Sequence, residues 1–394
     1  MIKTFFDKTI IINLLMIIIL LFIGFGSYSN GFANNINIAY SFLYLFCVVL
    51  MFNGEDLVFG LEKKKFVIIT LMFFSFSLSC FYSNFDSEIW YRLFCIFSSI
   101  FLGYVLYVVF KKNIIDFYGV NFILGLIGLV HVFVLLFTWF SVSDPENYNW
   151  VTGIPFFSNI RHLADFISIC FFSALFVFIF SNNKKVKFLY LMISVFILAC
   201  ILWSGSRAAY VSVFFSSLII FFRLNKYNKI YLLSIFSFAI ISSLFFKTNN
   251  PHLGILRSFS HSFNGSVNQV STGRFELYKE VLVWFSYKPL LGYGGEAVRL
   301  LNLGFLQAHN SILQILIEFG FIGFIFVLTI FYVFYRDFKK TKLNNKQIFC
   351  ISIVVNIIVA SFFNGGAYYV VTMSLMCLYL AGLYLEKNKD RFIL

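Results

Sequence analysis

Three short polar segments stand out in a chain that otherwise consists of long apolar runs. They are Ser204-Gly205-Ser206-Arg207, Ser271-Thr272-Gly273-Arg274 and Ala308-His309-Asn310-Ser311. Each lies at the edge of an apolar run, where a charged group is affordable and useful. The guanidinium fork matches phosphate oxygens, and a neutral imidazole can accept a proton. Together the segments predict a reaction centre that holds an anion beside a general base.

Arg207 lies in a tight connection between the apolar runs that end at Trp203 and begin at Ala208. A fixed cation next to helix N-termini suits phosphate oxygens, with a bidentate geometry that lysine lacks. The alternative is an arginine that anchors a helix at the membrane interface.

Arg274 opens the segment 274–288, which has helical spacing of its apolar residues. These are Phe275, Tyr278, Val281, Leu282 and Phe285. The pattern predicts an amphipathic helix that lies on the membrane surface or caps a cavity. Ser271 or Thr272 can cap its start, and Pro289 ends it. Arg274 then lies in the first turn, where backbone amides favour anions; the alternative is a solvated surface arginine.

His309 precedes Asn310 and Ser311, either of which can cap the next helix. The helix N-terminus and nearby arginines disfavour the imidazolium, so we expect a neutral histidine that can act as general base for a hydroxyl. A capping or packing histidine is the alternative. Glu318, two turns further along, could orient partners or bond within the bundle.

Two residues near position 160 offer an accessory site. Arg161 and Asp165 are spaced i,i+4 and can pair on one helix face. Alternatively, Arg161 or His162 helps to line an anion site, and both readings stay open.

Other ionisable residues are weaker candidates. We expect Arg92, beside Asp86 and Glu88, to extend to the membrane edge or to be paired, and His131 to bond a neighbouring helix. The pair Asp144 and Glu146 is weak evidence for a metal site, so we predict none.

The composition places these residues in a membrane protein. The 394 residues are 60% hydrophobic and 12% charged, whereas about a quarter of a soluble domain is charged. About 20 apolar residues span a bilayer, and we count twelve such runs, which predict an all-α polytopic protein. The runs are approximately 9–26, 36–52, 66–82, 89–110, 120–140, 160–180, 188–203, 208–222, 230–246, 310–334, 348–362 and 366–385.

The basic residues predict the orientation of the chain, because cytoplasmic loops keep Lys and Arg. One alternating set of segments holds most of them, and 27–35, 83–88, 141–159 and 364–365 hold none. We therefore expect both termini in the cytoplasm and one large external loop at 247–309, between spans nine and ten of a single membrane domain, 1–394. The first span is expected to be retained; a cleavable signal peptide is the alternative. The net charge of +13 is this topological signal, with no nucleic-acid partner implied.

Three longer segments carry a resemblance to a known family. They are 203–209 (WSGSRAA), 272–274 with 289–294 (TGR and PLLGYG), and 309–311 with 318–323 (HNS and EFGFIG). In this order, over roughly residues 155–330, they resemble the O-antigen ligase superfamily. That superfamily contains lipopolysaccharide O-antigen ligases, O-antigen polymerases and protein O-oligosaccharyltransferases.

The resemblance implies a fold, a reaction and a set of residues. The fold would be a glycosyltransferase of the GT-C-like type in the bacterial inner membrane, with its active site facing the periplasm. The donor would be a glycan on undecaprenyl pyrophosphate, transferred to a hydroxyl of lipid A-core without metal or other cofactor. Arg207 and Arg274 match the pyrophosphate-binding arginines, and His309 matches the proposed catalytic histidine.

Several functions fit the same sequence. We favour an O-antigen ligase, with an O-antigen polymerase or a protein O-oligosaccharyltransferase as alternatives. A lipid-glycan flippase would also have about twelve helices, but transporters place ionisable groups near mid-membrane and have related halves. Neither pattern is evident here.

Overall fold

The computed structural model of the chain describes residues 8–25, 28–29, 32–52, 63–83, 88–256, 273–339 and 341–389. The helices are α1 (Lys8–Gly24), α2 (Asn34–Phe52), α3 (Lys63–Phe81), α4 (Glu88–Lys111), α5 (Phe117–Ser141), α6 (Ile160–Phe180), α7 (Lys184–Trp203), α8 (Arg207–Phe221), α9 (Lys226–Ser243), α12 (Arg274–Tyr287), α13 (Ala297–Leu300), α14 (Ser311–Phe338), α15 (Asn345–Asn364) and α16 (Val370–Lys389). A 3₁₀ turn, η1 (Gly366–Tyr368), precedes α16, and two short strands, β1 (Tyr28–Ser29) and β2 (Phe32–Ala33), pair antiparallel.

Each of the twelve predicted apolar runs coincides with one of these helices. Among the described residues, seven helices are long and apolar enough to cross a membrane, and α1, α2, α8 and α16 contain shorter apolar stretches. The protein is therefore an all-helical, multi-pass membrane protein. The count of twelve crossings and the sidedness of the loop 247–309 stay predictions.

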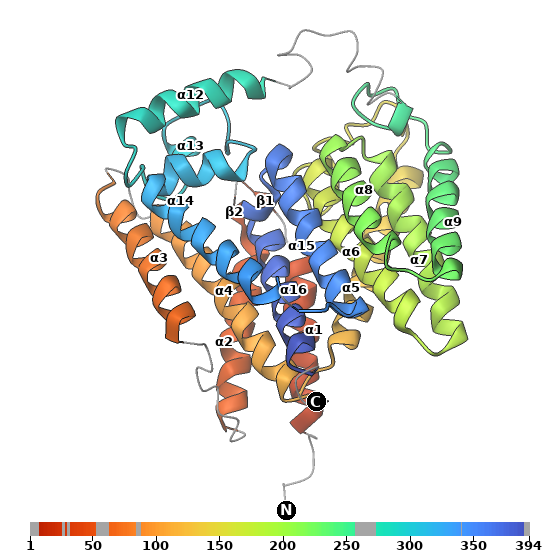
Figure 1. Cartoon of the computed structure of the whole chain (residues 1–394). Helices are drawn as coiled ribbons and strands as arrows, with labels where there is room; N and C mark the ends of the chain where they lie inside the picture. Colours follow the sequence, from red (N-terminus) through yellow and green to blue (C-terminus); the bar gives the residue numbers. More distant parts are fainter. Residues whose placement is uncertain are drawn as a thin grey trace, which may run out of the picture.

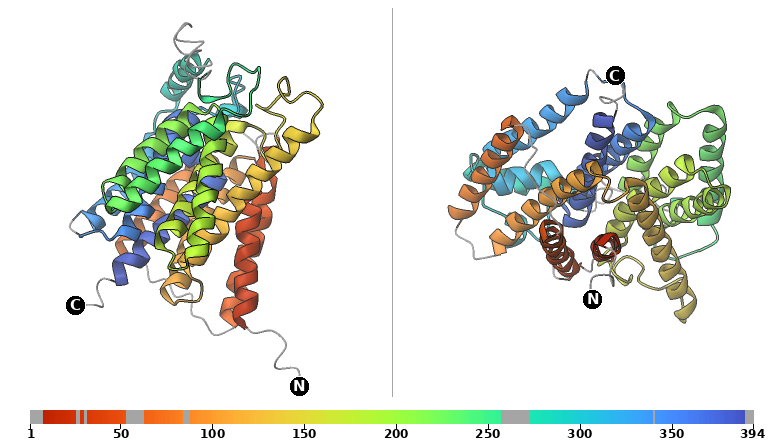
Figure 2. Two further views of the ribbon diagram at one scale, coloured as in Figure 1. Left: turned by 90° about the vertical axis from the view of Figure 1, so that its right-hand side faces the viewer. Right: turned by 90° about the horizontal axis from the view of Figure 1, so that it is seen from below.

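The helices form two groups that meet along α15 and α16 (Figure 1). One group contains α3, α4 and α14; the other contains α5 to α9. Helix α16 packs against α4, and α15 packs against α8 and α6, so this pair joins the groups. The view from below also shows α15 and α16 between the two groups (Figure 2, right).

Helix α6 is the most deeply enclosed of the membrane-length helices. Its side chains from Leu163 to Phe178 are all buried, which explains why it is apolar on every side. The first turn of α6 lies at the same end of the bundle as α12. A rigid central helix therefore carries Arg161, His162 and Asp165.

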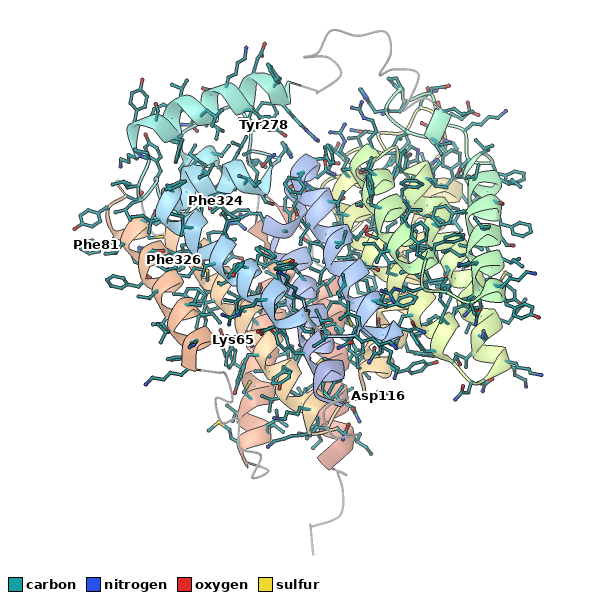
Figure 3. The ribbon with its side chains drawn as sticks, viewed as in Figure 1. Lys65, Phe81, Asp116, Tyr278, Phe324 and Phe326 are labelled. Atoms are coloured by element: carbon teal, nitrogen blue, oxygen red, sulfur yellow. The ribbon has the colours of Figure 1, made fainter. Side chains whose placement is uncertain are left out.

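Helix α12 lies across one end of the bundle, with Tyr278 on it, while Lys65 and Asp116 lie towards the opposite end (Figure 3). The predicted helix is confirmed, but the predicted apolar face is partly wrong. Leu277 and Val281 pack into a small core with α13 and α14, whereas Phe275 and Leu282 are about half exposed. The side of α12 that covers the bundle is therefore set by Leu277 and Val281.

Helix α14 breaks at Gly320, which has φ of 66° and ψ of −170°. The chain segment after α12 fills the break: the amides of Phe321 and Ile322 donate to the carbonyls of Pro289 and Leu290, at 2.8 and 3.2 Å. A Cβ on Gly320 would lie 2.2 Å from the Leu290 oxygen. The segments PLLGYG and EFGFIG thus pack on each other through backbone contacts that need glycine.

The glycines after α12 therefore pack closely against other backbone segments. Gly292 lies against the backbone of Glu318, where a Cβ would approach the Glu318 oxygen within 2.6 Å. Gly294 donates its amide to the same oxygen at 2.8 Å. This close packing fixes α12 and the start of α14 relative to each other.

Candidate active site

Arg207 is the first residue of α8, and its position follows from a glycine turn. Gly205 has φ of 70°, and a Cβ there would lie 1.9 Å from the carbonyl oxygen of His252. Ser206 caps α8 by accepting from the amide of Ala209 at 3.5 Å. The turn packs against the 250–254 segment, whose Gly254 amide donates to the Trp203 carbonyl at 2.8 Å. The Ser206 cap and the contacts with the 250–254 segment therefore fix Arg207 at the start of α8.

Arg274 is the first residue of α12, as the sequence predicted. The predicted capping residues Ser271 and Thr272 lie outside the described residues, and Gly273, with φ of 76°, occupies the N-cap position. The guanidinium reaches across to the end of α15. It donates to the backbone carbonyl of Phe363 and, at 3.1 Å, to Oδ1 of Asn364.

His309 lies directly before α14 in a left-handed backbone conformation, with φ of 52°. Asn310 is the N-cap, as predicted, and accepts from the amides of Ile312 and Leu313. The amide of Ala308 donates to Oε1 of Gln314 at 2.6 Å, and Nε2 of Gln314 donates to Glu318 at 2.7 Å. The loop that carries the histidine is thus held by a chain of two buried hydrogen bonds.

Arg161 and His162 lie in the first turn of α6. Asn159 caps the helix by accepting from the Arg161 amide at 2.9 Å, and the ring of His162 meets Tyr369 edge to face at 4.2 Å. The ion pair between Arg161 and Asp165, one of the two alternatives that the sequence left open, is not formed between these described residues. The buried Asp165 carboxylate instead faces α15, where it accepts from Nδ2 of Asn364 at 3.3 and 3.4 Å.

These side chains form one group, which we name the cationic cluster: Arg161, His162, Arg207, Arg274 and His309, with Asp165. Burial, together with the charges of Arg274, His162 and Arg161, lowers the pKa of His309 to about 3. The pKa of Arg274 is lowered first by burial and also by Arg207. Arg161 in turn interacts with the charges of Arg274 and Arg207. Three arginines thus share one site with a neutral histidine.

The cluster can stabilise an anion that carries several charges. Its three guanidinium groups outnumber the carboxylate of Asp165, which interacts with both Arg161 and Arg274. Repulsion among these like charges is relieved when a multiply charged anion enters. His309 stays unprotonated beside them and can accept a hydrogen bond or a proton.

Comparison with known proteins bears on the same region. Residues 192–328 match a family model described as O-antigen ligase. The matched segment, about a third of the chain, is similar to the O-antigen ligase family. Over 369 residues it is 22% identical to a protein of Rickettsia typhi named "Putative polysaccharide ligase", with 83% of this chain and 87% of that relative covered.

The segment that matches the family model contains Arg207, Arg274, His309 and Glu318. Arg161, His162 and Asp165 precede it, and Asn364 follows it. Helices α6 and α15, which lie outside the matched segment, therefore contribute the remaining residues of the cluster.

Glu318 does not lie in the cationic cluster. It belongs to a second group, which we name the paired cluster: Glu88, Arg92, Glu296, Arg299 and Glu318. Arg92 pairs with Glu296 and donates to the Tyr368 carbonyl at 3.3 Å, and Arg299 pairs with Glu88 at 2.5 Å. Glu318 interacts with the charges of Arg92 and Glu296. Its link to His309 runs through Gln314 and the backbone of Ala308.

The weaker candidates have structural partners. Arg92 is paired, as predicted, but with Glu296; Asp86 lies outside the described residues, and Glu88 pairs with Arg299. His131 bonds a neighbouring helix, as predicted, through the Gly24 carbonyl at 2.8 Å.

Sequence reasoning missed two residues that hold the site. Gln314 and Asn364 are uncharged, and nothing in their local spacing indicates their partners. An available signal was that Asn364 ends an apolar run next to Gly365, a pattern typical of a helix C-terminus.

Proposed function

We propose that this protein transfers a glycan from undecaprenyl pyrophosphate to a sugar hydroxyl of lipid A-core, as an O-antigen ligase of the bacterial inner membrane with its site facing the periplasm. The observation that carries the proposal is the convergence of Arg207, Arg274 and His309 from three separate segments, with Arg161 beside them. The family match over residues 192–328 and the relative's name support the class of reaction.

The reaction needs two kinds of help, and the cluster can give both. The acceptor oxygen attacks the anomeric carbon, and the bond from that carbon to the pyrophosphate oxygen breaks with both electrons leaving on the phosphate. Arg207 and Arg274, with Arg161 as an accessory cation, bind this negative charge where it develops. His309 takes the proton of the acceptor hydroxyl and later releases it to water or to the departing pyrophosphate.

Donor binding also prepares the base. In the protein alone, burial and the charge of Arg274 hold the pKa of His309 at about 3, which makes the imidazole a weak base. Bound pyrophosphate places negative charge among the arginines and favours the imidazolium. His309 therefore gains basicity when the donor is present, which couples proton transfer to an occupied site.

Deletion of the gene, followed by gel analysis of surface polysaccharide, tests the function. For a ligase, long glycan chains accumulate on the carrier lipid and are absent from lipid A-core. Single repeats attached to core would instead identify a polymerase. Unchanged lipopolysaccharide with loss of glycan from proteins would identify a protein O-oligosaccharyltransferase.

The proposed chemistry assigns no step to a metal ion. We therefore expect the purified protein, supplied with the lipid-linked glycan and lipid A-core, to keep its full transfer rate in a chelator such as EDTA. Strict dependence on an added divalent ion would contradict this scheme while leaving the arginine contacts to be tested separately.

A further inference from the structure

Residues from several segments of the cationic cluster contact the C-terminal end of α15. The last carbonyl groups of a helix have no partner within it and must find one elsewhere. Here Phe362 accepts from Nδ2 of Asn310 at 3.2 Å, next to His309, and Phe363 accepts from the guanidinium of Arg274. The end of one helix thus holds the start of α12 and the start of α14.

Asn364 adds a contact of a different kind. Its amide is buried, with 4% of the residue exposed, and it uses both ends. Oδ1 accepts from Arg274 at 3.1 Å, and Nδ2 donates to both oxygens of Asp165 at 3.3 and 3.4 Å. The orientation of the amide follows from its partners, because an arginine only donates and a carboxylate only accepts. Asn364 therefore stands between a cation and a carboxylate that do not touch.

We propose that Asn364 is the positioning residue of the pyrophosphate site, holding Arg274 through a neutral amide so that the guanidinium keeps its charge for the donor. This inference rests on the proposed function, because it assumes that Arg274 binds pyrophosphate. Asp165 fixes the amide from the other side. Both residues lie outside the segment that matches the O-antigen ligase model.

An amide suits position 364 because it forms hydrogen bonds without carrying a charge. A carboxylate at position 364 would pair directly with Arg274 and compete with the pyrophosphate for the same donors. It would also face Asp165, and two buried carboxylates repel each other. An apolar residue would leave the buried Asp165 without its hydrogen bonds, which is costly. Asparagine offers an acceptor and a donor without a charge.

The first test compares Asn364→Ala with Asn356→Ala. Asn356 is the matched control because it lies on the same helix, is 1% exposed and also bonds α6, through Ser168 at 2.6 Å. The readout is the affinity of the purified full chain for undecaprenyl pyrophosphate, together with its thermal unfolding. We expect Asn364→Ala to weaken binding about tenfold, the effect of one charge-assisted hydrogen bond. Asn356→Ala should bind as wild type does.

The second test exchanges the two partners in the double variant Asp165→Asn with Asn364→Asp. The exchange keeps the total charge and the hydrogen bond between α6 and α15, but it moves the carboxylate onto Arg274. We expect Asn364→Asp alone to lower thermal stability and the double variant to recover it. Binding of undecaprenyl pyrophosphate should stay about tenfold weaker in the double variant, and KM for the donor should rise more than kcat falls.

Three outcomes would overturn the inference. They are equal binding losses in Asn364→Ala and Asn356→Ala, wild-type binding in the double variant, and a double variant no more stable than Asn364→Asp. None of these would disprove the transferase itself. If His309→Ala and Arg274→Ala keep full transfer, the proposed function fails, whatever Asn364 does.

Discussion

The cationic cluster and the paired cluster use arginine in opposite ways. In the paired cluster, Arg92 and Arg299 meet the carboxylates of Glu296 and Glu88 directly. In the cationic cluster, Arg274 meets a carbonyl and an amide, and Asp165 is held one residue away. A buried ion pair holds helices together, whereas a guanidinium bound only to neutral oxygens keeps its charge for a ligand. We therefore propose that the paired cluster has a structural role and that the cationic cluster binds the ligand.

The largest effect is expected from the histidine of the cationic cluster. His309→Ala removes the proposed proton acceptor, and loss of a general base slows the reaction by about a hundredfold or more. Membrane abundance should stay near normal, because the loop keeps its Ala308 and Asn310 hydrogen bonds. The measurement is transfer per molecule of membrane protein, and retained transfer would remove His309 from the mechanism.

The arginines give the next largest effect. Arg207→Lys and Arg274→Lys keep the positive charge but lose the bidentate hydrogen bonding of the guanidinium group. We therefore expect the transfer rate to fall about tenfold in each variant, mainly through a higher KM for the donor. Arg299→Lys is the control from the paired cluster and should change transfer less than about twofold. Equal effects at Arg274 and Arg299 would erase the distinction between the two clusters.

The paired cluster should respond in stability. Arg92→Leu leaves Glu296 buried without its partner, and breaking a buried pair costs about 3 to 5 kcal/mol. Replacing both Arg92 and Glu296 by leucine should restore much of the loss. Thermal unfolding and abundance measure this, and the protein that remains folded should transfer at nearly the wild-type rate. A large fall in transfer by folded Arg92→Leu would place Arg92 in the site.

The smallest effect concerns pH. Because burial and Arg274 lower the pKa of His309 to about 3, the imidazole of the free protein stays unprotonated as pH falls from 8 to 5. The profile of kcat/KM, which reports the free enzyme, should therefore contain no inflection from His309 in this range. An inflection near pH 6.5 that disappears in a slow His309 variant would contradict the lowered pKa of the imidazole.

The sequence predicted the helices well, because membrane-length apolar runs are a strong local signal. It also named Arg207, Arg274 and His309, since charged residues at the edges of such runs are conspicuous. It could not place Asn364 beside Asp165, which lies 199 positions away in the chain. Contacts of that kind depend on how helices pack, and neither residue differs locally from an ordinary polar end of a helix.

The glycines illustrate the same limit. Gly292 and Gly294 follow α12 and pack against the backbone of Glu318, next to the break of α14 at Gly320. A glycine signals either conformational freedom or close approach, and only the neighbouring backbone distinguishes these. The apolar face of α12 was partly wrong for a related reason: Phe275 and Leu282 are apolar but face outward, which is common for a helix at a membrane surface.

Binding of undecaprenyl pyrophosphate is the most direct test of the contrast between the clusters. The affinity of the purified full chain should be measured for wild type, Arg274→Gln and Arg299→Gln, with thermal unfolding to confirm that each is folded. We predict that Arg274→Gln weakens binding about tenfold or more, while Arg299→Gln binds within about twofold of wild type. Wild-type affinity in Arg274→Gln, or equal losses in the two variants, would contradict the account.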